Sequence, residues 1–276
     1  RNGAGKSTAL RIAMGITTPS AGHLRLLGEP MRGAGTRLRR AIGYVAQDQS
    51  FYDWMDATSI GRFVAGFYPS WEQAEYDRLL DLLELPRRRR LGGFSGGMHA
   101  KLALALALAH RPRLLLLDEP TAGMDAVARR EFIELVRDNA QRNQRTTVFS
   151  SHLIDEVELA ADTVGVIDAG RMLFEGPLAV LRSSVLALSR DQPEAGVDPI
   201  PSAPTVGLPF EGLLQEGRVE LLQDRVRHGE RRLIVRSAAT ETLQWVAARG
   251  AEQGWRVTHP SLEDTFVALV TRSVSL

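Results

Sequence analysis

The chain begins with a glycine-rich segment that runs directly into a lysine and two hydroxyl residues. Its first eight residues read R-N-G-A-G-K-S-T. A phosphate-binding loop follows the pattern G-x-x-x-x-G-K-[ST], and Gly5, Lys6 and Ser7 match the end of that pattern. The leading glycine of the pattern, and the strand that normally carries the loop, would precede Arg1, so we expect the sequence to start within the motif. The segment predicts a site for nucleotide phosphates.

Lysine is rare in this chain, which makes its position informative. The sequence has 34 Lys and Arg residues, and only Lys6 and Lys101 are lysines. A compact ammonium group fits inside a ring of backbone N–H groups around phosphate oxygens, whereas a planar guanidinium does not. We therefore expect Lys6 to contact phosphate and Lys101 to be a solvated surface charge.

Length and composition limit the class of protein. A chain of 276 residues has room for one large domain and a small one. Its 44% hydrophobic and 24% charged residues are typical of a soluble globular protein. A net charge of +1 argues against a nucleic-acid partner bound through bulk electrostatics. The lack of cysteine excludes disulfides and thiolate metal sites, and no apolar run is as long as a transmembrane helix.

Short apolar segments alternate with helical patterns through the first part of the chain. Such alternation predicts a parallel sheet covered by helices on both faces. Residues 98–110 alternate Leu and Ala with the period of a strand, but both are strong helix formers, so we predict a buried helix. The expected strands are 23–27, 41–47, 114–117, 146–150, 164–168 and 172–175, and the expected helices are 7–14, 71–85, 98–110 and 125–139.

The composition changes after about Ser189. Residues 191–209 hold five of the 13 prolines and little periodicity, which indicates a linker or a long loop. The pattern beyond the loop predicts a small α+β domain. Its expected strands are 218–226, 231–236 and 255–259, and its expected helices are 241–253 and 261–270.

Further motifs follow the glycine-rich segment in a fixed order. Gln47 ends the second expected strand, the sequence F-S-G-G-M opens the helix at 98–110, and L-L-L-L-D-E-P-T carries the strand 114–117 into two acids. The strand 146–150 runs into S-S-H, which ends at His152. Each motif by itself is common at the surface of proteins that bind no nucleotide. Their combination in this order is not.

Together these motifs resemble the ATP-binding cassette of ABC transporters, over residues 1 to about 181. The resemblance implies an α/β fold: a P-loop NTPase (RecA-like) core with a helical signature subdomain, and a small C-terminal α+β domain. We expect the cassette at 1–183 with its helical subdomain at about 51–109, a linker at 184–210 and the small domain at 211–276. The segments at 67–71 and 260–266 further resemble the ABC-2-type exporter ATPases.

The resemblance implies ATP and Mg²⁺ as ligands and assigns roles to residues. Glu119 matches the general base that polarises water, His152 matches the histidine at the γ-phosphate, and Gln47 matches the glutamine that senses Mg²⁺ and the γ-phosphate. The Mg²⁺ ligands are then Ser7, Gln47 and Asp118. The phosphates are held by the glycine-rich segment, namely Asn2, Gly3, Ala4, Gly5, Lys6, Ser7 and Thr8.

A second anion site is expected at Ser95, Gly96 and Gly97, because this turn opens a helix. In the family, this site serves the nucleotide of a partner cassette, so the resemblance implies a head-to-tail homodimer or heterodimer with ATP in the interface. Asp125 matches the segment that crosses this interface. Phe94 and Met98 depart from the usual Leu and Gln without removing the hydroxyl or the glycines.

The family also implies a separate transmembrane permease and a cytoplasmic position, peripheral on the inner face of the membrane. No nucleic-acid partner is expected, and the arginine run 87–90 is read as a solvated loop. The aromatic stretch at 51–55 has two readings: the core of the helical subdomain, or a groove for a helix of the permease. The alternative function is a soluble ABC ATPase that acts on ribosomes or DNA.

Overall fold

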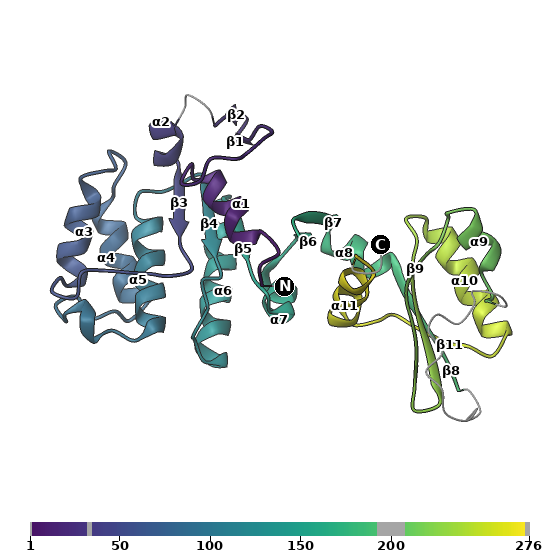
Figure 1. Ribbon diagram of the computed structural model, residues 1–276. Coiled ribbons are helices and arrows are strands. Elements are labelled where there is room, and N and C mark those ends of the chain that lie inside the picture. Colours follow the sequence, from purple (N-terminus) through teal and green to yellow (C-terminus); the bar gives the residue numbers. More distant parts are fainter. Residues whose placement is uncertain (1, 32–34, 192–207, 274–276) are drawn as a thin grey trace. The chain divides into compact units, whose positions relative to one another are not determined.

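The computed structural model describes residues 2–31, 35–191 and 208–273. The chain forms two compact units, Arg1–Ala160 and Ala161–Leu276 (Figure 1). The boundary therefore falls earlier than the end of the expected cassette at residue 183. No helix in the described part of the chain is long and apolar enough to cross a membrane.

The centre of the first unit is a parallel sheet with the strand order β3-β4-β5. Its strands are β3 (Ile42–Val45), β4 (Leu114–Asp118) and β5 (Thr146–Ser150). All of β4 is buried, because it is hydrogen-bonded on both edges and apolar side chains pack on both of its faces. Leu115 and Leu117 pack with helix α5 (Gly96–Leu108), whereas Leu114 and Leu116 pack with helix α1 (Lys6–Ala13).

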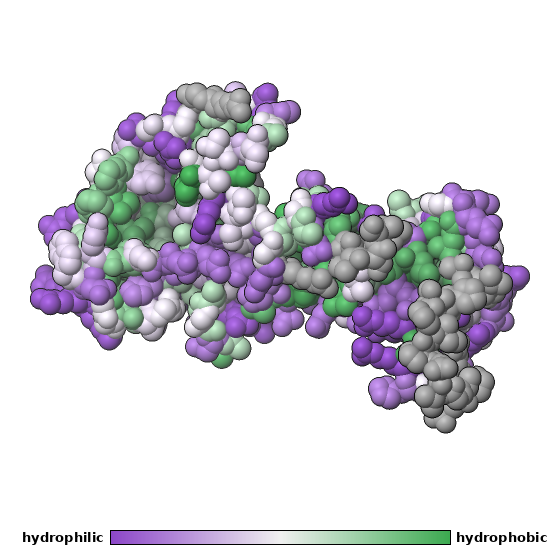
Figure 2. Space-filling view, viewed as in Figure 1, coloured by the Kyte–Doolittle hydropathy of each residue, from purple (hydrophilic) through white to green (hydrophobic). Residues whose placement is uncertain are grey.

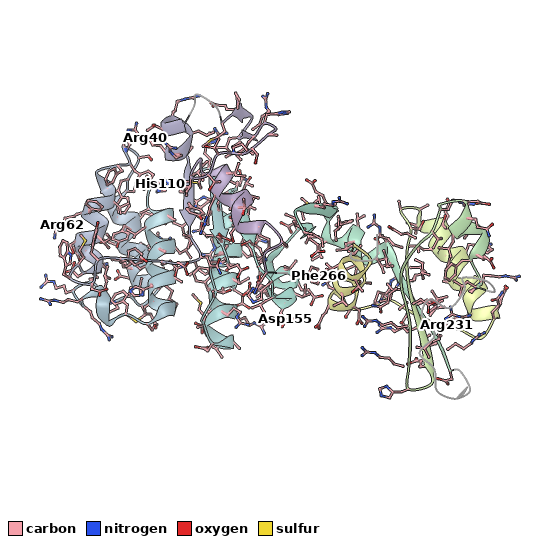
Figure 3. The ribbon with its side chains drawn as sticks, in the orientation of Figure 1. Arg40, Arg62, His110, Asp155, Arg231 and Phe266 are labelled. Atoms are coloured by element: carbon pink, nitrogen blue, oxygen red, sulfur yellow. The ribbon has the colours of Figure 1, made fainter. Side chains whose placement is uncertain are left out.

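Residues 98–110 are helical, as predicted. Helix α5 (Gly96–Leu108) is buried from Ala100 onward, apart from Lys101 and Ala103, which are partly buried, so its leucines and alanines need no helical periodicity. The helix packs so closely on β3 that a Cβ at Gly43 would lie 2.5 Å from the carbonyl oxygen of Ala107. Just beyond α5, buried His110 donates a hydrogen bond from Nε2 to the carbonyl of Ile42 at 3.3 Å (Figure 3). Desolvation lowers the pKa of His110, which keeps the ring neutral.

Residues 51–109, where we expect the helical subdomain, contain α3 (Ala57–Ala65), α4 (Gln73–Leu82), the 3₁₀ turn η1 (Leu91–Gly93) and α5. Helix α3 was not predicted, although Asp56 and Ser59 form a capping box at its start. The buried hydroxyl of Tyr76 on α4 donates to the carbonyl of Ala57 at 2.7 Å and ties the two helices together.

The remaining elements of the first unit surround the sheet (Figure 1). They are α1 (Lys6–Ala13), β1 (Arg25–Leu26), β2 (Glu29–Pro30), α2 (Gly35–Arg40), α6 (Ala126–Arg142) and α7 (Ile154–Ala160). Strands β1 and β2 form a small antiparallel hairpin. Strand β1 falls within the strand expected at 23–27, and β2 follows it.

The second unit opens with a hairpin and not with a strand of the parallel sheet. Strand β6 (Thr163–Asp168) was expected to extend that sheet, but it pairs antiparallel with β7 (Arg171–Pro177). The reason is the two-residue turn between them, in which Ala169 and Gly170 both have positive φ, as tight hairpins require. Helix α8 (Leu178–Ser183) follows.

A four-stranded antiparallel sheet forms the core of the second unit, in the order β11-β8-β10-β9. Strand β8 (Val185–Asp191) corrects the expected linker at 184–210, because its apolar residues 185–188 are buried and pair with β10. The rest of that linker lies largely outside the described residues. The other elements are α9 (Glu211–Gln215), β9 (Glu220–Arg227), β10 (Glu230–Arg236), α10 (Thr240–Glu252), β11 (Arg256–Thr258) and α11 (Leu262–Ser273).

Candidate active site

Asp118, the last residue of β4, is the centre of a buried polar cluster in the first unit. Its side chain is fully buried, and its Oδ1 accepts hydrogen bonds from Ser7 Oγ at 2.9 Å and Ser150 Oγ at 2.8 Å. Its Oδ2 is buried without a hydrogen-bond partner. A buried carboxylate oxygen without a donor is costly, and a cation would satisfy it. The geometry therefore leaves one oxygen of Asp118 available to a metal ion.

Glu119 joins two other predicted residues at the same edge of the sheet. Its Oε1 lies 3.3 Å from Lys6 Nζ, and its Oε2 lies 3.1 Å from His152 Nδ1. The backbone of Glu119 has a φ of 44°, and its N–H donates to the carbonyl oxygen and the hydroxyl of Ser150 on the next strand. The fold thus brings together Lys6, Glu119 and His152 from three separate segments of the sequence.

The glycine-rich segment has the backbone that a phosphate cradle needs. Gly3 and Gly5 have φ values of 74° and 106°, in the left-handed region where glycine carries no steric penalty. Helix α1 starts at Lys6, directly after Gly5, so the N–H groups of its first turn have no acceptor within the helix. These N–H groups lie beside the hydroxyl of Ser7, which contacts Asp118. This end of α1 suits an anion next to the acidic pair.

Gln47 lies at the same edge of the sheet, but its side chain is exposed. It follows Val45 by two residues, and Val45 pairs with Leu117 on β4. The carboxyl end of β3 therefore places Gln47 beside the acidic pair. Its role toward Mg²⁺ or phosphate stays a prediction.

The second expected anion site lies at the start of α5. Ser95 caps this helix, since its hydroxyl accepts a hydrogen bond from the N–H of Met98 at 3.3 Å. Ser95 and Gly96 are exposed, and a Cβ on Gly96 would meet no atom within 4 Å. Asp125 caps α6, and the N–H groups of Ala128 and Val127 lower its pKa. These positions are open to a partner, and their ligand roles stay predictions.

Glu156 is a residue of this region that the sequence analysis missed. It lies on α7 and is only 3% exposed. Its carboxylate accepts hydrogen bonds from Thr121 Oγ1 and Ser151 Oγ, both at 2.5 Å, and Arg129 Nε lies 3.6 Å away. Glu156 thus joins the turn after Glu119 to the segment that carries His152. Three acids lie within residues 155–158, and nothing in their spacing marks the one that is buried.

The aromatic stretch at 51–55 is divided between the core and the surface of its subdomain, and its role toward a permease stays a prediction. Met55 is buried and Phe51 packs against the core of the helical subdomain. Tyr52 and Trp54 are instead 59% and 69% exposed, and their rings lie 5.8 Å apart. Phe63 and Phe67 are also exposed, and Figure 2 shows hydrophobic side chains at the surface over α3. The helical subdomain therefore has an apolar surface as well as an apolar core.

With this geometry established, comparison with known proteins identifies the class. Residues 1–122 match the family model described as ABC transporter. Residues 1–122 therefore form part of an ABC transporter ATP-binding domain, and the fold is that of a P-loop NTPase.

Named relatives extend the match beyond the family model. The chain is 34% identical over 186 residues to an uncharacterized ABC transporter ATP-binding protein of Bacillus subtilis, covering 66% of this chain and 61% of the relative. It is 39% identical over 184 residues to the Nod factor export ATP-binding protein I of Neorhizobium galegae, covering 64% and 52%. It is 33% identical to the bacitracin transport ATP-binding protein of Bacillus licheniformis, covering 66% and 60%. The chain thus spans between half and two thirds of these relatives.

Solved structures agree on the fold. The structure of an ATP binding subunit of an ABC transporter is 28% identical and superposes with a TM-score of 0.58, covering 66% of this chain and 78% of that one. A dimeric ATP-binding cassette bound to ADP and phosphate gives the same TM-score at 23% identity, covering 64% and 82%. The second likeness bears on the fold alone.

Proposed function

We propose that this chain is the ATP-binding and ATP-hydrolysing subunit of an ABC transporter. The observation that carries the proposal is the convergence of Lys6, Ser7, Asp118, Glu119 and His152 at one edge of the parallel sheet. A cation-bearing loop, a buried acid with one unsatisfied oxygen and a second acid beside a histidine are the parts that phosphoryl transfer to water needs.

In the proposed reaction, each residue has a separate task. The first turn of α1 and Lys6 hold the β- and γ-phosphates. The Oδ2 of Asp118 and the hydroxyl of Ser7 would hold a Mg²⁺ ion, which would supply positive charge to neutralise the phosphates. Glu119 accepts a proton from the attacking water, while His152 holds Oε2 of Glu119 in place and faces the γ-phosphate.

The proposal includes a second cassette. The exposed hydroxyl of Ser95 and the glycines after it form a helix N-terminus that can bind the phosphate of a nucleotide held by a partner. Asp125 lies at the start of α6, in the segment proposed to cross that interface. Both a homodimer and a heterodimer fit these residues.

We further propose a separate membrane permease as partner, at the cytoplasmic face of a membrane. Two of the relatives are named for export or transport, which supports a transporter and an exporter over a soluble ATPase acting on ribosomes or DNA. The exposed rings of Tyr52 and Trp54 follow Gln47 closely in the chain and suit an interface anchor. A Trp54→Ala variant is expected to bind ATP normally and to lose permease in a pull-down; retention at wild-type levels contradicts this role.

The experiment that tests the ATPase is Glu119→Gln. Gln keeps the shape and the contact to Lys6 but cannot accept the proton, so ATP hydrolysis is expected to fall on the order of 100- to 10,000-fold. ATP should then accumulate in a dimer visible by gel filtration. Glu84→Gln, an exposed acid in the helical subdomain, is the matched control and should be unchanged. Turnover within a few-fold of wild type would show that Glu119 is not the base.

A further inference from the structure

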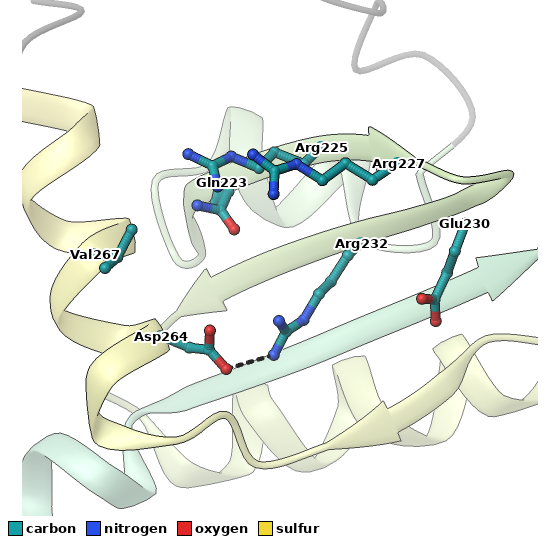
Figure 4. A pocket seen from close by; sticks show the side chains of 7 residues that line it. All are labelled: Gln223, Arg225, Arg227, Glu230, Arg232, Asp264 and Val267. Carbon is teal, nitrogen blue, oxygen red and sulfur yellow. Dashed lines mark hydrogen bonds and ion pairs between the residues drawn. The ribbon is translucent and has the colours of Figure 1, made fainter.

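A row of polar side chains lies on one face of the β9–β10 hairpin in the second unit. Gln223, Arg225 and Arg227 alternate along β9 and so share a face, and the register places Arg232 opposite Arg225. Helix α11 forms a wall beside this row (Figure 4). The resulting pocket has a volume of about 270 Å³ and is lined by Gln223, Arg225, Arg227, Glu230, Arg232, Asp264 and Val267.

The two acids of this pocket already have cationic partners. Arg232 donates to Asp264 at 2.8 Å and lowers the pKa of that carboxyl group. Glu230 lies 3.7 Å from the guanidinium of Arg256 on β11. Neither acid therefore has its full charge left for the arginines of β9.

Arg225 and Arg227 carry positive charge that the pocket balances only in part, because Glu230 stands opposite Arg227 in the register but also lies near Arg256. Within the described ranges, neither guanidinium has an ion-pair or hydrogen-bond partner, and both side chains are exposed. Arg225 also faces Arg232 directly across the two strands. Like charges at opposite positions destabilise a sheet, so the folded hairpin bears a small cost here. An anion in the pocket would remove that cost.

We propose that this pocket binds the phosphate group of an anionic ligand. Residues two apart on a strand are about 7 Å apart, so the forks of Arg225 and Arg227 can reach one group from two sides. Together the guanidinium groups of Arg225 and Arg227 can engage about two negative charges, which a phosphate monoester or a diphosphate supplies and a single carboxylate does not. Gln223 adds a carboxamide for a neutral polar part of the ligand, and Val267 adds an apolar wall. This site is separate from the glycine-rich segment and does not depend on the proposed function.

The test measures pyrophosphate binding to the full chain by isothermal titration calorimetry. All variants carry Lys6→Ala, which weakens the other phosphate site. In this background, Arg225→Gln with Arg227→Gln should weaken pyrophosphate binding on the order of tenfold or more. The control, Arg142→Gln with Arg249→Gln, removes the same charge from two exposed helix arginines and should bind as before. Arg225→Lys with Arg227→Lys keeps the charge, loses the forks and should lie between them.

A second arm identifies the source of the phosphate. The same variants are sedimented with phosphatidylcholine vesicles that contain or lack phosphatidylglycerol. If the protein binds the anionic vesicles through Arg225 and Arg227 but does not bind pyrophosphate, the ligand is a lipid headgroup. If it binds pyrophosphate and not the vesicles, the ligand is a soluble phosphate compound. Equal binding by the double Gln variant and its control in both arms overturns the proposal. Thermal melting checks the fold. Arg225→Gln removes a like charge that faces Arg232 and Arg227→Gln removes an opposite charge that faces Glu230, so the double Gln variant should melt close to its control.

Discussion

Asp118 in the first unit and Asp224 in the second are both largely buried acids on strands, but their partners differ. Asp118 is held by the hydroxyls of Ser7 and Ser150, which leave its negative charge unneutralised and one oxygen unsatisfied. Asp224 is held by Arg231, which donates to its two oxygens at 3.0 and 2.6 Å.

The carboxylate charge of Asp118 therefore remains available to a ligand, whereas that of Asp224 is paired within the fold. Hydroxyl donors orient a carboxylate without cancelling its charge, so a cation still gains from approaching Asp118. A bidentate guanidinium cancels the charge of Asp224 and fixes β9 to β10, the strands that carry the two residues. The two acids should therefore respond in opposite ways to loss of charge.

The largest expected effect is on activity, at Asp118. Asp118→Asn keeps the shape but removes the charge offered to a divalent cation, so ATP hydrolysis should fall on the order of a thousandfold. The melting temperature should stay the same or rise, because a buried, unneutralised charge is gone. ATPase assays and thermal melting of the same preparation check both. A variant that melts early and keeps its activity would remove the contrast with Asp224.

The next effect is on stability, at Asp224. Asp224→Asn leaves the guanidinium of Arg231, whose residue is 9% exposed, without its counter-charge, and should lower the free energy of unfolding by about 3 kcal/mol. ATP hydrolysis at 25 °C should not change. Urea unfolding followed by circular dichroism measures the loss. Asp224→Leu combined with Arg231→Leu should recover most of it, and failure of this double variant to do so would mean that the pair itself stabilises the sheet.

Substitution of Glu156 should affect both activity and stability, because its partners are two hydroxyls, as for Asp118, and one guanidinium, as for Asp224. Glu156→Gln keeps one acceptor oxygen and loses the other, so stability should fall by about 1 to 2 kcal/mol. Since Ser151 precedes His152, kcat should also fall, on the order of tenfold, while KM for ATP stays within about twofold. Steady-state kinetics separates the two parameters. Glu158→Gln, two residues along, is the matched control and should leave kcat unchanged.

The smallest expected effect is at Asp264, which is paired with Arg232 at the surface. The pair lowers the pKa of Asp264, so its stabilisation is present above the unfolded pKa of about 4 and is lost as pH falls through the lower, folded value. At pH 7, Asp264→Asn should cost about 0.5 kcal/mol, since both side chains are partly exposed. At pH 2 the variant and the wild type should melt together. A difference that persists at pH 2 would mean that packing of α11, and not charge, is lost.

Much of the first unit was predictable from sequence because its signals are local. The strand at 114–117 is a short apolar run, and the glycines of the phosphate loop are fixed by backbone geometry. The carboxyl ends of parallel strands meet at one edge, so Asp118 and the segment leading to His152 could be placed together before the structure was known. The buried helix at 98–110 was predicted because the high helix propensity of Leu and Ala outweighed the strand-like period of their alternation.

Other features depend on partners that the sequence does not mark. Strand β8 is read as part of a linker because prolines follow it within a few residues, and only its pairing with β10 makes it a strand. Glu156 resembles its acidic neighbours until the hydroxyls of Thr121 and Ser151 are placed around it. The free oxygen of Asp118 depends on which of its two oxygens the serines occupy.

The ion pair between Lys6 and Glu119 has a consequence for the order of events in the proposed reaction. The same ammonium group is needed by the arriving phosphates and is held by the base, at 3.3 Å. An incoming nucleotide must therefore draw Lys6 away from Glu119, so the carboxylate loses this partner only when the substrate has bound. Substrate binding and release of Glu119 from Lys6 are thus one event in the proposed reaction.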